Sequence, residues 1–182
     1  MRLYTLTMLK NRAFQFAVAY SLLAIAYKIA LIVSGHALDQ FNFYFSGIIS
    51  VLAIIPFIFL TVKYTRQDNG GYIGGKEALK SGLLMAVISA IILSVYNYIE
   101  FEWVWRDLSV EYYHSNEFRL FLEKNKQIKP EEYPEKIQAA IHELSAFKAM
   151  TAKLATLLFF SLGTAFMCAV FMKRNRPAFS QN

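Results

Sequence analysis

The sequence predicts an all-α, polytopic membrane protein with four transmembrane helices and an extracytoplasmic helical hairpin between spans three and four. Hydrophobic residues make up 56% of the 182 residues. This share is higher than in typical soluble domains, whose surface must be covered by water. Four apolar stretches are each about 20 residues long, the length a helix needs to cross a hydrocarbon core of about 30 Å. The segments between these stretches differ in their Lys and Arg content, as the two sides of a membrane protein do.

The chain reads as a single membrane domain over residues 1–182. We place the spans at residues 13–34, 43–62, 79–99 and 149–172, and an extracytoplasmic helical insertion at residues 100–148. The first span resembles a secretory signal because basic residues precede it. Its apolar run is too long for a signal core and contains Lys28, so we expect an uncleaved signal anchor.

The basic residues divide the chain by membrane side. Residues 35–42 contain no Lys or Arg and residues 100–148 are net acidic, so both should lie outside. Both termini and residues 63–76 should be cytoplasmic. A net charge of +6 that is spread by side rather than gathered in one patch predicts no nucleic-acid partner. The cytoplasmic basic residues are Arg2, Lys10, Arg12, Lys63, Arg66, Lys76, Lys80, Lys173, Arg174 and Arg176.

Span one carries Lys28 about 10 Å inside its outer end, at 1.5 Å of rise per residue. Its amine either snorkels to the outer interface or pairs inside the bundle, and both interpretations stay open. If spans one and three are neighbours, the amine reaches Asn97 or Glu100 of span three, and Lys153 of span four lies near the same level. These four residues form a predicted polar cluster for an anionic ligand.

Span two contains Pro56, which predicts a kink, and the loop after it is rich in glycine. Gly70 to Lys76 matches the first seven positions of a phosphate-binding loop. Glu77 stands where that loop needs a hydroxyl for magnesium, and no strand precedes the glycines, so we expect no nucleotide. The segment is a turn, or it binds anionic lipid headgroups through Lys63, Arg66, Lys76 and Lys80.

Span three has a small residue at every fourth position: Gly82, Ala86, Ala90 and Ser94. A helix places them in one stripe on which another backbone can approach closely. We expect the stripe to pack against Ser161, Ala165 and Ala169 of span four. The alternative is the same face of a second copy, which would make a homodimer.

The insertion begins with an aromatic cluster typical of the membrane interface. We expect an amphipathic helix after a break near Asp107, then a turn at residues 126–130. Pro130 and Pro134, beside Glu131, Glu132 and Glu135, predict a helix start. Since no glycine or proline follows before Gly163, that helix should run directly into span four.

No complete catalytic or cofactor motif is present. Glu111 and His114 have the spacing of one half of a di-iron site, but the motif occurs once, so we expect no metal. Cys168 lies within span four, and no span contains a histidine to activate it. We therefore expect no enzyme activity and no cofactor.

Two segments resemble a bacterial family of four-span integral membrane proteins known as domain of unknown function 4199. They are the Gly-rich stretch from Gly71 to Gly82 and the helix start from Lys129 to Ile137. The chain departs from the pattern at Asp107-Leu108, where Asp-Pro is expected. The resemblance covers most of the chain and is strongest in these two segments. It implies four helices in a bacterial inner membrane and assigns no catalytic residues.

These observations predict an assembly or interaction partner that presents the outer hairpin. The alternative is a small transporter or channel with a polar cluster around Lys28, although no span contains an acidic residue. The expected partners are membrane lipids and a protein bound through residues 100–148.

Overall fold

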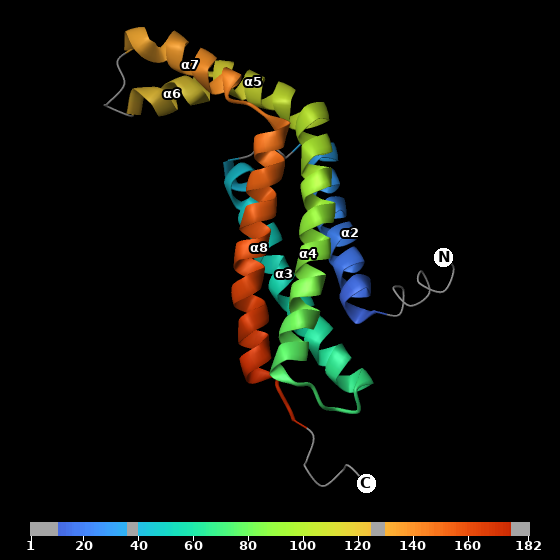
Figure 1. The fold of residues 1–182 in the computed structure, drawn as a ribbon. Coiled ribbons are helices and arrows are strands. Elements are labelled where there is room, and N and C mark those ends of the chain that lie inside the picture. The colour runs from blue at the N-terminus through green and yellow to red at the C-terminus, as the bar shows by residue number, and fades with distance from the viewer. Residues whose placement is uncertain (1–10, 36–39, 125–129, 176–182) are drawn as a thin grey trace, which may run out of the picture. The chain divides into compact units, whose positions relative to one another are not determined.

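The computed structural model describes residues 11–35, 40–124 and 130–175, which form helices and short connections (Figure 1). It divides into two compact units. The membrane unit comprises Met1–Leu93 and Lys153–Asn182, and the insertion unit comprises Ser94–Ala152. The insertion unit therefore takes in the end of span three and the start of span four as well as the predicted insertion.

Among the described residues, four helices are long and apolar enough to cross a membrane, which confirms the predicted all-α fold with four membrane-spanning helices. They are α2 (Arg12–Val33), α3 (Gln40–Asp68), α4 (Gly75–Glu100) and α8 (Ala146–Phe171). α3 and α4 both extend beyond the predicted spans at the turn that joins them. α3 remains helical on both sides of Pro56.

α2 begins at a side-chain cap and packs along α3. Asn11 accepts a hydrogen bond from the Ala13 amide at 2.9 Å, which satisfies one of the free amides of the first turn. Farther along, the Tyr20 hydroxyl donates to the Ser50 carbonyl at 2.5 Å, and the Tyr20 ring lies 5.4 Å from that of Phe57. A buried hydroxyl needs such a partner in hydrocarbon, so this bond helps to fix the pairing of the two helices.

The small-residue stripe of α4 is a packing face, as predicted. A Cβ atom added to Gly82 would lie 3.1 Å from the Ala165 Cβ of α8 and 3.2 Å from the Ile58 Cγ2 of α3. Ala86 and Ala90 are completely buried. Any larger residue at position 82 would displace these neighbours by at least a few tenths of an ångström, because three helices approach closely there.

The insertion unit differs from the prediction at its first break. α4 does not break near Asp107; it continues through a π-helical turn, Phe101–Trp105, into α5 (Arg106–His114). A π turn takes up one extra residue while the backbone stays hydrogen-bonded, so the helix survives. The chain turns instead at extended Ser115, whose hydroxyl accepts from the Phe118 amide at 3.2 Å at the start of α6 (Asn116–Lys124).

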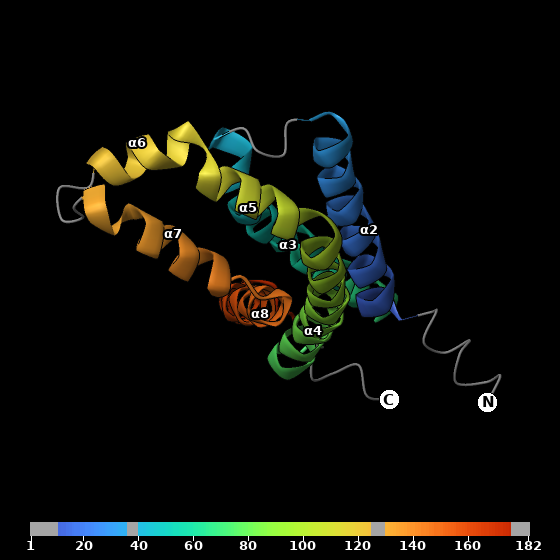
Figure 2. The same cartoon turned by 90° about the horizontal axis from the view of Figure 1, so that it is seen from above.

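The return path confirms one prediction and overturns another. Pro134 lies in the first turn of α7 (Tyr133–His142), after a short 3₁₀ turn at Pro130–Glu132, as expected of a helix start. However, α7 does not run into span four. It ends at His142, and α8 begins at Ala146, where the Ser145 hydroxyl accepts from the Lys148 amide at 3.4 Å. Within this unit α5 packs against both α6 and α7 (Figure 2).

Candidate functional site

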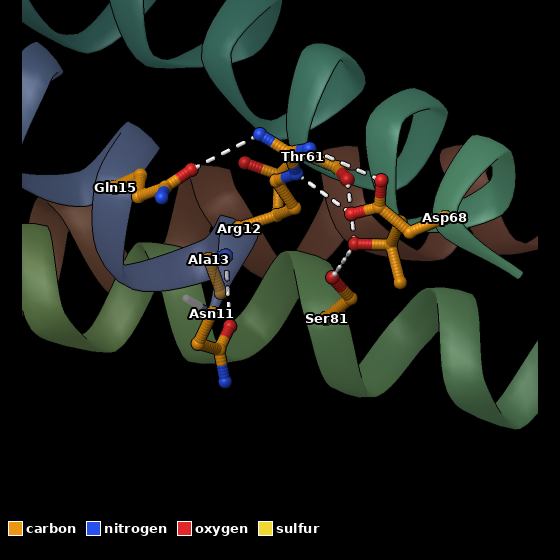
Figure 3. A network of polar contacts seen from close by, with 8 residues as sticks. Asn11, Arg12, Ala13, Gln15, Thr61, Asp68 and Ser81 are labelled. Carbon is orange, nitrogen blue, oxygen red and sulfur yellow. Dashed lines mark hydrogen bonds and ion pairs between the residues drawn. The ribbon is translucent and has the colours of Figure 1, made fainter. Parts of the chain in front are cut away.

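The start of α2, the α3–α4 turn and the end of α8 meet at one end of the membrane unit, which we call the basic end. Arg12 at the start of α2 binds both carboxylate oxygens of Asp68, the last residue of α3, at 2.7 and 3.1 Å (Figure 3). The guanidinium also donates to Gln15 at 3.2 Å and lies 5.8 Å from the Tyr64 ring centroid. Two parallel bonds fix a geometry, although partial exposure keeps their contribution to stability small.

Hydroxyl groups join α3 to α4 beside this ion pair. The Thr65 hydroxyl donates to the Thr61 carbonyl at 2.8 Å, one turn earlier in α3. The Ser81 hydroxyl of α4 lies 3.0 Å from the Thr65 oxygen, to which it therefore donates (Figure 3). These two hydrogen bonds, from Ser81 to Thr65 and from Thr65 to the Thr61 carbonyl, link the two helices just before the turn.

The Gly-rich segment is a structural turn. Gly70 and Gly71 have φ of 71° and 89°, and their amides bond to carbonyls in the last turn of α3, which is the usual way glycine ends a helix. Ile73 then pairs with Arg174, beyond α8, through two backbone bonds of 3.0 and 2.9 Å. The Glu77 carboxylate accepts from the Asn69 amide at 2.6 Å. These contacts tie the turn to the end of α3, to the first turn of α4 and to the segment after α8.

The four residues predicted to bind lipid headgroups do not form one cluster; only Lys76 and Lys80 line the same groove. Arg66 points to the Met172 carbonyl at 3.5 Å, near the end of α8, where the helix dipole favours a cation. Lys63 is half-buried on α3. Lys76 and Lys80 lie together on α4, exposed, on an open groove whose other lining residues are Leu79, Leu83, Leu84 and Val87.

The predicted polar cluster crosses the boundary between the two units. Lys28 and Lys153 belong to the membrane unit, whereas Asn97 and Glu100 belong to the insertion unit. Within the insertion unit, Glu100 is buried, with 4% of its surface exposed. The cluster itself stays a prediction.

An aromatic row holds the insertion unit together. The Phe118 ring lies 4.9 Å from Tyr113, 5.5 Å from Tyr112 and 6.0 Å from Phe121. The outer side of α6 remains exposed, with Leu120 at 55% and Phe121 at 53%. In the sequence this surface shows only as an adjacent apolar pair at residues 120 and 121, outside the predicted site residues.

In the described part of the insertion unit, six charged side chains form three ion pairs. Glu102 contacts Arg106 at 2.7 Å, and Arg119 contacts Glu123 at 3.5 Å. The Lys148 ammonium bonds to Glu143 and lowers the pKa of that carboxyl. Among the described residues, no group of three or more His, Cys, Asp or Glu side chains is placed to hold a metal ion. His114, from the predicted half-motif, bonds to the Val110 carbonyl at 2.8 Å through Nδ1.

A family model described as "Protein of unknown function (DUF4199)" matches residues 15–174. The chain belongs to the DUF4199 family. The match of this DUF4199 protein runs from residue 15 of the membrane unit, through residues 94–152 of the insertion unit, to residue 174. No curated protein and no solved structure matches the chain.

Proposed function

We propose that this DUF4199 protein is a non-enzymatic, multi-pass protein of a bacterial inner membrane that acts as an assembly or interaction partner. The insertion unit is its binding module and faces away from the cytoplasm. The partner is a protein with an apolar patch and a basic rim.

The orientation is argued from charge and from contacts at the basic end. Arg12–Asp68 and Ile73–Arg174 hold the start of α2, the α3–α4 turn and the end of α8 at one end of the membrane unit. All three segments are rich in Lys and Arg, and such segments remain in the cytoplasm. This supports two cytoplasmic termini.

The observation that carries the proposal is the exposed apolar pair on α6. The insertion unit has a packed interior of its own, in which Leu122 and Tyr133 are buried. Leu120 and Phe121 are each more than half exposed beside it. Adjacent exposed apolar side chains on a helix that already has a core mark an interaction surface. A net acidic unit favours a basic rim on its partner.

The contacts within the membrane unit support an interaction partner over a transporter. The hydroxyls of Thr61, Ser89 and Thr164 each donate to a carbonyl one turn earlier in their own helix. Hydroxyls bonded in this way have their donor satisfied within their own helix and do not need water as an acceptor. A small transporter or channel built around Lys28 is the alternative that the experiment below also tests.

Site-specific photocrosslinking in intact cells tests the proposal. A photoreactive amino acid at Phe121 should give a discrete adduct with a second protein, whereas the same group at Gln138, an exposed residue of α7, should not. Leu120→Glu with Phe121→Glu should abolish co-purification of the adduct's protein, and Gln138→Glu should preserve it. Adducts to lipid alone, or solute flux in liposomes that Lys28→Met abolishes, would contradict the proposal.

A further inference from the structure

The first turns of α4 form a two-part surface at the basic end. Lys76 and Lys80 are four residues apart and so share one face of the helix. They line a groove of about 490 Å³ with Leu79, Leu83, Leu84 and Val87. The cations are at the helix start and the apolar residues follow toward the membrane interior. A ligand that fits has an anionic head and a long apolar tail.

The size of the groove suits an acyl chain. Lys76 and Val87 are separated by eleven residues, or about 16 Å of helix, which is roughly half of a hydrocarbon core about 30 Å thick. Leu84 and Val87 are about 40% exposed, so the walls face outward from the bundle. The apolar stretch from Leu79 to Val87 accounts for about 12 Å of this length, which is most of one leaflet's depth.

The charges around the groove leave both amines available for an anion. The nearest acid, Glu77, bonds to Asn69 and lines a different pocket with Tyr72 and Arg174. Among the described residues, neither Lys76 nor Lys80 forms an ion pair. The first amides of α4 add the positive end of the helix dipole.

We propose that Lys76 and Lys80 bind the phosphate of one anionic phospholipid, with an acyl chain in the groove from Leu79 to Val87. The site takes a phospholipid of the surrounding leaflet and not a soluble phosphate, because four of its six lining residues are apolar. The site includes only some of the basic residues at this end of the protein. Arg66, for example, is directed to the Met172 carbonyl and lies outside the groove. This site is separate from the proposed interaction surface on α6.

Native mass spectrometry of the full-length protein, with phosphatidylglycerol and phosphatidylcholine compared, tests the proposal. The protein should retain one phosphatidylglycerol in preference to phosphatidylcholine. Lys76→Gln with Lys80→Gln should lower that affinity about 25-fold, because each lysine at an anionic headgroup contributes roughly fivefold. Lys63→Gln with Lys173→Gln removes the same charge from the same end and should lower it much less.

Two further variants test the two parts of the site separately. Val87→Trp should fill the groove and displace the lipid while the melting temperature in lipid-free detergent stays unchanged. Lys76→Arg with Lys80→Arg should retain it. Equal binding of the two lipids, equal losses in the two double Gln variants, or displacement by inorganic phosphate would overturn the proposal.

Discussion

In the membrane unit, the fully buried positions include many small residues, whereas in the insertion unit aromatic rings pack against one another. Ala17, Ala86, Ala90 and Ala165 are completely buried, while Phe159 and Phe171 are about 75% exposed. In the insertion unit, Phe118 lies among three other rings, and charged residues share the surface with the exposed pair on α6. The contrast follows from the solvent. Lipid gives no gain for burying a large apolar side chain, so helices associate through close backbone approach, whereas water drives the rings inward.

Gly82→Leu tests the packing of the membrane unit and should have the largest effect. Its first added carbon would already lie 3.1 Å from Ala165 and 3.2 Å from Ile58, so α3 and α8 must move. We expect a loss of about 3 kcal/mol, the upper end of the usual cost of overpacking, and Ala86→Leu should behave similarly. Thermal unfolding in detergent measures it.

Gly163→Leu is the matched control. An added Cβ at that position of α8 has no atom within 4 Å, so the variant should melt no lower than the wild type. Equal melting temperatures for the Gly82 and Gly163 variants would show that close approach is not what holds the membrane unit together.

Phe118→Ala tests the other side of the comparison. Removing the central ring of the aromatic row should destabilise the insertion unit by about 2 kcal/mol, which is below the value for a fully buried Phe because Phe118 is half-buried. Limited proteolysis should show faster cleavage within residues 94–152. Melting of the membrane unit should change little, and a parallel loss in both units would mean that they fold together.

A smaller effect is expected for the ion pair that joins α2 to α3. Arg12→Ala and Asp68→Ala should each cost less than about 1 kcal/mol, because the pair is roughly 40% exposed. The double variant should cost less than the sum of the two, since the bidentate contact couples the residues. A double-mutant cycle in detergent measures the coupling. Strictly additive losses would show that the contact between Arg12 and Asp68 does not stabilise the protein.

The smallest effect should be a pH dependence in the insertion unit. Lys148 lowers the pKa of Glu143 from its usual 4.5, so this contact contributes stability above pH 4.5 that is lost as the pH falls through the lower folded-state pKa. NMR titration should therefore give a pKa below 4.5 for Glu143. Lys148→Gln should return it to the usual value, and an unchanged pKa in that variant would exclude the pair as its cause.

The sequence by itself determined the elements whose signals are local. Four apolar stretches become helices because lipid leaves the backbone no other hydrogen-bond partners, and the four-residue spacing of Gly82, Ala86 and Ala90 puts them on one face. Pro134 marks a helix start because its missing amide matters least there.

The tertiary structure decided the contacts between distant residues and the outcome of local competitions. Nothing local to Arg12 or Arg174 indicates that Asp68 or Ile73 lies opposite, because each pair depends on how whole helices pack. At Ser115 and Ser145 a capping hydroxyl competed with a continuing apolar pattern, and the cap ended the helix. Near Asp107 the helix continued, because the π turn at Phe101–Trp105 accommodated one extra residue. In each case the two local conformations differ in free energy by about 1 kcal/mol, so packing against the rest of the fold decides which one forms.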